Sequence, residues 1–235
     1  MAGGGSAQAV ANQVPEKYPR PFLGPPAIAV LISGRGTNLQ SIIDATRSGH
    51  LSATIAIVIS NRSVAPGLIR ARAAGIEAVC LNPRDYANRD TYDRTIVDML
   101  RARDVRLICL AGFMRVVGLP LLEAFSNRIL NIHPSLLPAF PGLDAQRQAL
   151  EHGAQITGAT VHVVTSELDG GPIVLQAAVP VLDDDTVDTL SARVLIEEHR
   201  IYPEAIRLVL DGGWSIEGRR FVRSRHAEKP RTKLQ

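Results

Sequence analysis

The chain has 235 residues, 46% of them hydrophobic, so it is long enough to bury a substantial core without disulfide staples. It contains no run of about 18 apolar residues that would span a membrane, and its first residues lack the basic and apolar segments of a signal peptide. Both cysteines, Cys80 and Cys109, lie in apolar runs typical of inert core thiols in a reducing compartment. These features predict a cytoplasmic protein without a membrane partner.

The formal net charge of +3 is unevenly distributed. Residues 219–235 contain seven Lys or Arg and one Glu, a charge of +6, which leaves −3 for the rest of the chain. A nucleic-acid-binding domain needs basic residues spread over a folded face, so we expect no nucleic-acid partner. Residues 219–233 are interpreted as a solvated, poorly ordered terminus, with 223–235 forming a basic tail.

Residues 1–26, rich in Gly, Ala, Gln and Pro, are interpreted as a flexible leader. From Ala27 onward, apolar runs alternate with helical stretches, the pattern of βαβ units. The predicted strands cover residues 27–33, 53–60, 77–81, 105–110 and 128–133. The predicted helices between them cover residues 37–47, 66–74, 89–103 and 119–126. Right-handed crossovers then give an α/β fold with a doubly wound, mostly parallel, Rossmann-like sheet.

The alternation of strands and helices ends after residue 133, where prolines and a glycine over 134–142 predict an irregular loop. A short helix at 145–152 follows, and strands at 158–165 and 173–179 predict an antiparallel extension after residue 155. A long helix over 186–210 has Thr186 as its N-cap, and Pro203 is expected to kink it or divide it.

The first motif that carries chemistry is Ser-Gly-Arg-Gly-Thr-Asn at 33–38, between the first strand and the first helix. Backbone N–H groups and the helix dipole favour an anion there, and a phosphate is the natural ligand. Because Leu39 stands where a dinucleotide fingerprint needs its third glycine, the motif is not that fingerprint. The alternative is a Gly-rich turn in which Thr37 or Asn38 caps the helix.

The second motif is Asn131-Ile132-His133-Pro134, at the carboxyl end of the fifth predicted strand, where ligands of open α/β sheets gather. Side chains alternate along a strand, so Asn131 and His133 project from one face. An amide donor beside an imidazole suits a carbonyl that becomes an oxyanion and needs a proton. The alternative is that both side chains satisfy loop backbone groups.

The third candidate is Asp169, in a Gly-rich loop, whose carboxylate is suited to orient an imidazole and raise its pKa. The alternative is an ordinary Asx-turn before Gly170 and Gly171. The other histidines, His162 and His199 among them, lack ligand spacing, so no metal site is expected.

Together and in this order, these motifs resemble the phosphoribosylglycinamide formyltransferases, the folate-dependent enzymes of purine synthesis. The resemblance runs over residues 28–210 and rests on the stretches 32–40, 111–115, 131–138, 168–172 and 198–203. It implies that a formyl group passes directly from 10-formyltetrahydrofolate to the amine of glycinamide ribonucleotide through a tetrahedral intermediate, without a metal. It also implies that residues 27–222 form the formyltransferase domain, with a phosphate-binding half at 27–126 and a folate-binding half at 127–222.

The resemblance assigns roles residue by residue. Asn131 and His133 stabilise the oxyanion, and Asp169 keeps His133 positively charged. The residues implied to hold the phosphorylated substrate are Gly36, Thr37, Asn38 and Glu198. The residues implied to bind the folate are Arg89, Met114, Arg115, Val116, Val117, Thr165, Ser166, Glu167, Leu168 and Asp169.

The chain departs from the family after Pro138. Many relatives have Lys where this chain has Ala139 and His where it has Asp144, and Ser166 stands where an acidic residue is common. A formyltetrahydrofolate hydrolase and a non-catalytic phosphometabolite-binding module remain as alternatives. A methionyl-tRNA formyltransferase has a further basic domain that the residues after 210 are too few to supply. The sequence leaves open whether the chain is a monomer or a homodimer.

Overall fold

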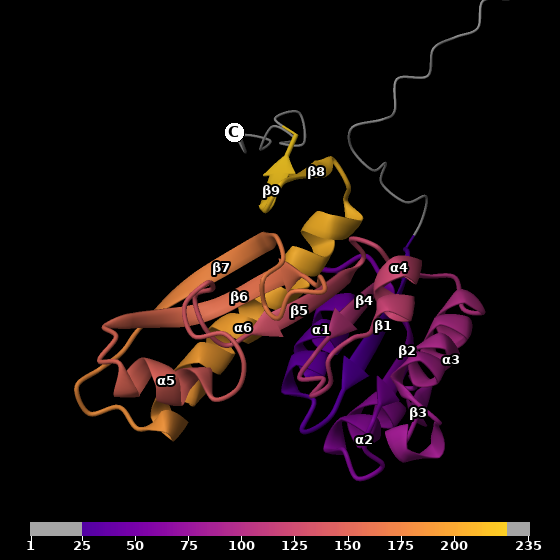
Figure 1. Cartoon of the computed structure of the whole chain (residues 1–235), viewed down its shortest axis with the longest axis horizontal. Helices are drawn as coiled ribbons and strands as arrows, with labels where there is room; N and C mark the ends of the chain where they lie inside the picture. The colour runs from indigo at the N-terminus through magenta and orange to yellow at the C-terminus, as the bar shows by residue number, and fades with distance from the viewer. Residues whose placement is uncertain (1–24, 225–235) are drawn as a thin grey trace, which may run out of the picture.

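The structure is a computed structural model that describes residues 25–224 (Figure 1). The predicted leader lies outside this range up to residue 24, and the predicted tail from residue 225. The strands are β1 (Ala27–Ile32), β2 (Thr54–Ser60), β3 (Ala78–Cys80), β4 (Val105–Leu110), β5 (Ile129–His133), β6 (Ile156–Val163), β7 (Ile173–Pro180), β8 (Trp214–Glu217) and β9 (Arg220–Arg223). The helices are α1 (Thr37–Arg47), α2 (Pro66–Ala73), α3 (Arg89–Arg101), α4 (Leu119–Ala124), α5 (Ala145–Glu151) and α6 (Val187–Leu210), with a 3-10 turn at Pro83–Asp85.

One mixed sheet joins all these strands in the order β3-β2-β1-β4-β5-β6-β7-β9-β8. Strands β1 to β5 run parallel to one another, as the alternating βαβ pattern predicts. Strand β1 lies near the middle of this parallel part and is apolar throughout. Its side chains alternate between two cores, with Ile28, Val30 and Ile32 in one and Ala29 and Leu31 in the other.

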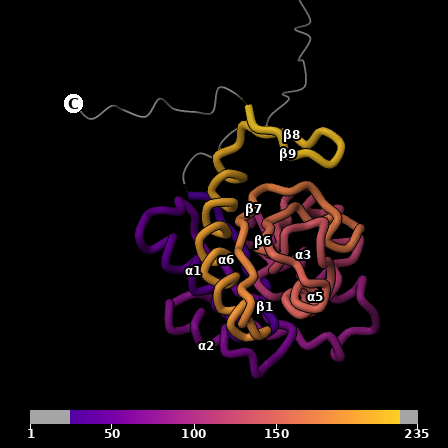
Figure 2. Tube along the Cα trace, turned by 90° about the vertical axis from the view of Figure 1, so that its left-hand side faces the viewer, coloured from indigo at the N-terminus to yellow at the C-terminus, as the bar shows by residue number. Residues whose placement is uncertain are grey.

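Helices cover both faces of the sheet, which confirms the doubly wound prediction. Buried side chains of α1, α2 and α6 share one core, and those of α3 and α4 share the other. Figure 2 shows α6 lying beside α1, and residues of the two helices are in contact. Within residues 25–224 no helix is both long and apolar enough to cross a membrane.

The antiparallel extension is also confirmed. Strand β6 runs antiparallel to β5, and β7 runs antiparallel to β6. The register of β5 and β6 places Asn131 opposite His162 and His133 opposite Thr160. Side chains of β6, a strand that comes later in the chain, therefore lie beside those at the carboxyl end of β5.

Helix α6 begins as predicted, because Thr186 forms a capping box with Thr189. Of the two outcomes predicted for Pro203, a kink or a division, the division is wrong, since α6 continues from Val187 to Leu210 with the proline inside it. Proline removes one N–H from the helix ladder. Core side chains on both sides of it, including Tyr202 and Ile206, are fully buried, and this packing outweighs the lost hydrogen bond.

The hairpin of β8 and β9 corrects the interpretation of residues 219–223 as part of a solvated terminus. Strand β9 pairs with β8 along its length and touches β7 where Arg220 meets Ile173. Trp214 and Phe221 stack across the hairpin with ring centroids 5.0 Å apart. Figure 1 shows the hairpin beyond the carboxyl end of α6. The apolar side chains on both sides of Gly218 indicate a β-hairpin, but the basic residues among them led to the interpretation as a solvated terminus.

Candidate active site

The two polar side chains at the end of β5 meet the predicted carboxylate. Asn131 is half-buried and His133 is buried with 4% of its surface exposed. Nδ1 of His133 lies 3.5 Å from Oδ2 of Asp169. Asp169 reaches this position because the loop after β6 turns back across the sheet. Gly171 lies so close to β6 that a Cβ there would be 1.8 Å from the carbonyl oxygen of Val163.

His133 is held by a second partner on the other side of its ring. Nε2 lies 2.9 Å from the carbonyl oxygen of Phe140, which can only accept, so Nε2 carries a proton. Burial lowers the pKa of His133 below its usual 6.5, and it outweighs the raising effects of the Phe140 carbonyl and of Asp169. Burial therefore opposes the positive charge that Asp169 is predicted to maintain on His133.

Asp169 remains ionised. Burial is the largest influence on its pKa and acts to raise it. The Gly142 backbone N–H, which donates to Oδ2 at 2.8 Å, and the neighbouring imidazoles of His162 and His133 outweigh burial and lower the pKa below 3.8. A carboxylate with two imidazoles beside it is thus available to stabilise a proton that arrives on His133.

His162 belongs to this cluster although its sequence position gave no sign of it. It is buried on β6, with Nδ1 3.1 Å from the carbonyl oxygen of Val163, which places the proton on Nδ1. With the proton on Nδ1, Nε2 is the acceptor to which Asn131 Nδ2 donates at 3.2 Å. This bond fixes the Asn131 amide and leaves its second N–H group free. The pairing of β5 with β6 is the signal that identifies His162.

The predicted phosphate loop lies where β1 passes into α1. Gly36 is the N-cap of α1 with φ 71°, a left-handed conformation that favours glycine. No side chain caps this helix, so neither Thr37 nor Asn38 acts as the capping residue that the alternative required. The first N–H groups of α1 have no acceptor within the helix and remain available to an anion.

Asn38 and Glu198, both predicted to hold the phosphorylated substrate, contact each other. Nδ2 of Asn38 donates to Oε2 of Glu198 at 2.6 Å, and both side chains are buried. Burial raises the pKa of Glu198, and the bond from Asn38 opposes part of that rise. Oδ1 of Asn38 is buried without a partner. Glu198 is therefore not a solvated surface carboxylate. The pair forms a buried polar contact between α1 and α6.

Ser33 connects the phosphate loop with residues 114–117, which are predicted to line the folate pocket. Its Oγ accepts from the Met114 N–H at 2.7 Å and donates to Oδ1 of Asn61 at 2.6 Å. Its N–H donates to the carbonyl oxygen of Gly112 at 3.0 Å. Met114 and Val116 expose 59% of their surfaces, which is unusual for apolar side chains and suits an apolar ligand.

The remaining folate candidates from the first half of the chain lie around α3. Arg89, at its first residue, is exposed, whereas Arg115 stacks over the ring of Tyr92 with its guanidinium carbon 4.8 Å from the centroid. Asp93 accepts from the Gly118 N–H at 2.7 Å, next to Val117, which is buried. Loop 114–118 is thus anchored at one end by Ser33 and at the other by α3.

The loop that carries Asp169 presents the last candidates. Thr165 is half-buried and Ser166 and Glu167 are exposed, while Leu168 exposes 66% of its surface. Glu167 forms an ion pair with Arg219 of the hairpin at 2.9 Å. Within residues 25–224 no group of three or more His, Cys, Asp or Glu side chains is arranged to hold a metal ion.

Comparisons with known proteins identify the family. Residues 27–206 match the family model for formyl transferase. The chain is 47% identical over 185 residues to the phosphoribosylglycinamide formyltransferase of Escherichia coli, covering 79% of this chain and 87% of that protein. The chain belongs to the phosphoribosylglycinamide formyltransferase family.

Two further relatives agree. A crystal structure of glycinamide ribonucleotide transformylase 1 from Symbiobacterium toebii superposes with a TM-score of 0.84 at 58% identity, covering 85% of this chain and 94% of that one. The trifunctional purine biosynthetic protein adenosine-3 of Homo sapiens is 49% identical over 185 residues, but the chain spans only 18% of its length. As a member of this family, the chain has the fold that its motifs predict.

Proposed function

We propose that this chain transfers the formyl group of 10-formyltetrahydrofolate to the amine of glycinamide ribonucleotide, in de novo purine biosynthesis in the cytoplasm. The observation that carries the proposal is the convergence of Asn131, His133 and Asp169 at the carboxyl end of β5, with 3.5 Å between the imidazole and the carboxylate. A non-catalytic phosphometabolite-binding module would have no need to bring these three side chains together.

The proposed reaction begins when the amine nitrogen attacks the formyl carbon. A new C–N bond forms, the carbonyl oxygen becomes an oxyanion, and collapse of the tetrahedral intermediate breaks the bond from carbon to the folate nitrogen. The amine loses a proton, and the folate nitrogen gains one. The free N–H of Asn131 is suited to hold the oxyanion. His133 takes up the proton that the amine loses and gives it to the folate nitrogen, and Asp169 stabilises the imidazolium while it exists.

The substrates are proposed to occupy opposite ends of this centre. The N–H groups of Gly36, Thr37 and Asn38 hold the phosphate, and Glu198 faces the ribose or amine side through its contact with Asn38. Met114, Arg115, Val116 and Val117 line the pterin pocket, Arg89 meets the folate tail, and residues 165–169 close over the pterin. In the same proposal, residues 27–126 form the phosphate-binding half of the domain and residues 127–222 form the folate-binding half.

The test is to incubate the purified chain with 10-formyltetrahydrofolate and follow loss of the formyl donor with and without glycinamide ribonucleotide. The proposal expects loss only when the amine is present, with formation of formylglycinamide ribonucleotide. Loss that is equal without the amine would identify a formyltetrahydrofolate hydrolase instead. No loss under either condition, together with binding of the ribonucleotide, would identify the binding module. Light scattering of the same preparation distinguishes a monomer from a homodimer.

A further inference from the structure

The phosphate loop is held from outside by helix α2, through two carbonyl groups. The N–H of Gly67 donates to the carbonyl oxygen of Gly34 at 3.1 Å. Nε of Arg70 donates to the carbonyl oxygen of Arg35 at 2.9 Å. In a trans peptide the C=O and the following N–H point in opposite directions. By holding these two carbonyl oxygens, α2 turns the N–H groups of Arg35 and Gly36 away from itself.

The loop and α2 also touch backbone to backbone. A Cβ on Gly36 would lie 2.7 Å from the Cα of Gly67, which no ordinary contact allows. A Cβ on Gly67 would lie 2.4 Å from Cδ1 of Ile32 and 3.2 Å from the carbonyl oxygen of Gly34. Gly36, with its left-handed φ of 71°, therefore requires glycine, and Gly67 leaves little room for a side chain, so the loop and α2 are in direct backbone contact.

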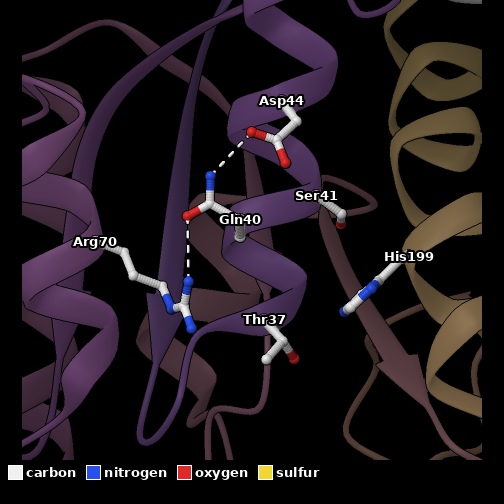
Figure 3. A pocket seen from close by; sticks show the side chains of 6 residues that line it. All are labelled: Thr37, Gln40, Ser41, Asp44, Arg70 and His199. Carbon is white, nitrogen blue, oxygen red and sulfur yellow. Dashed lines mark hydrogen bonds between the residues drawn. The ribbon is translucent and has the colours of Figure 1, made fainter. Parts of the chain in front are cut away.

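The Arg70 side chain is exposed, yet neighbouring side chains fix its direction. Nη1 of Arg70 donates to Oε1 of Gln40 at 3.4 Å, and Nε2 of Gln40 donates to Oδ1 of Asp44 at 2.9 Å. Figure 3 shows this chain of side chains along the outer face of α1, at the edge of a hollow that also includes Thr37 and His199. Arg70 is thus oriented by α1 while it holds the loop that precedes α1.

We propose that Arg70 is a positioning residue for recognition of the substrate phosphate. It acts through the Arg35 carbonyl, which fixes the direction of the Gly36 N–H, and it need not contact the substrate. This inference rests on the proposed function, because that function places the phosphate on the loop. It predicts that loss of Arg70 weakens use of glycinamide ribonucleotide and leaves the folate site unchanged.

The test compares Arg70→Gln and Arg70→Lys with Arg72→Gln. Arg72 lies on the same helix, is exposed and contacts the carbonyl oxygen of Ala78 at 3.3 Å, so its substitution removes the same charge without touching the loop. Initial rates are measured with each substrate varied in turn. Hydrogen–deuterium exchange of the amides at 35–37 is measured on the same proteins without either substrate.

For Arg70→Gln we expect KM for glycinamide ribonucleotide to rise roughly fivefold, the effect of losing one hydrogen bond. The kcat and the KM for the folate stay within about twofold of wild type, and the amides at 35–37 exchange faster. Lysine keeps one donor and restores most of the KM, and Arg72→Gln behaves as wild type. An unchanged KM in Arg70→Gln, or an equal rise in Arg72→Gln, would overturn the inference. If the wild-type chain does not transfer formyl, the proposed function fails, and the exchange measurement alone decides whether Arg70 fixes the loop.

Discussion

Nδ1 of His133 lies 3.5 Å from Oδ2 of Asp169, although one residue ends strand β5 and the other lies in the loop before β7. Two opposing influences act on the imidazole at this distance. Burial lowers its pKa, while the Asp169 carboxylate and the Phe140 carbonyl raise it. Because these influences oppose each other, the imidazole is suited to take up a proton and to release it during one reaction cycle.

Removing the Asp169 charge therefore shifts the His133 pKa in a known direction. In Asp169→Asn the raising influence of the carboxylate is lost and burial remains, so the pKa of His133 falls further below 6.5. The titration of the His133 ring is followed by NMR of its ring nitrogens in both proteins. A pKa that stays the same or rises in the variant would show that Asp169 does not act on the imidazole.

The same pKa shift makes folding stability depend on pH. The folded-state pKa of His133 lies below 6.5, so between that pKa and 6.5 the unfolded chain binds more protons than the folded chain. The free energy of unfolding should therefore fall as the pH drops below about 6.5. In His133→Gln this loss between pH 7 and pH 5 should be smaller, as measured by urea denaturation at each pH. His50→Gln, at an exposed position, is the control, and an equal reduction there would contradict the assignment.

His162 should act on catalysis through Asn131. His162→Ala removes the acceptor that orients the Asn131 amide, so kcat is expected to fall roughly tenfold, the effect of about one hydrogen bond. A double-mutant cycle with Asn131→Ala isolates the coupling. Because His162 also lies 3.6 Å from Asp169, we expect the double variant to be only slightly slower than Asn131→Ala alone, and faster than the product of the two single effects would give. Effects that multiply instead would mean that the two side chains act separately.

Ser33 should influence both substrate sites. Ser33→Ala leaves the Met114 N–H and Oδ1 of Asn61 without their partner, which costs on the order of 1–3 kcal/mol in a buried setting. The KM values for both substrates should rise, and thermal unfolding should occur a few degrees earlier. Ser48→Ala is the control, because that hydroxyl is exposed and its partners, the Ala45 carbonyl at 3.2 Å and Nδ1 of His50 at 2.9 Å, belong to neither loop. A wild-type KM for the folate in Ser33→Ala would refute the connection between the loops.

Much of the fold follows from local sequence patterns. The parallel strands are continuous apolar runs, α2 begins at Pro66 and ends before Gly75, and α3 begins at a capping box, so β1 to β5 and α1 to α4 occur where their patterns predict them. The hairpin at Trp214–Arg223 was missed because its basic residues suggested a solvated terminus. Its stability comes from pairing with β7 and from the stacking of Trp214 on Phe221, contacts that depend on tertiary structure.

In the candidate site too, some residues can be predicted from the sequence and others are identified only by the structure. Residue types and alternation along β5 are enough to propose Asn131 and His133 as a pair. His162 is different, because only the register of β6 against β5 places it beside Asn131. The direction of the His133 pKa shift could not be predicted from the sequence either, since it depends on burial by elements far away in the chain.

The most direct test of the reaction centre is steady-state formyl transfer by His133→Ala, with binding of both substrates measured by calorimetry. The account predicts that kcat falls by roughly a hundredfold or more, the contribution typical of a general acid, while both substrates still bind. Unchanged formyl transfer in this variant would contradict the assignment of His133, and with it the proposed mechanism.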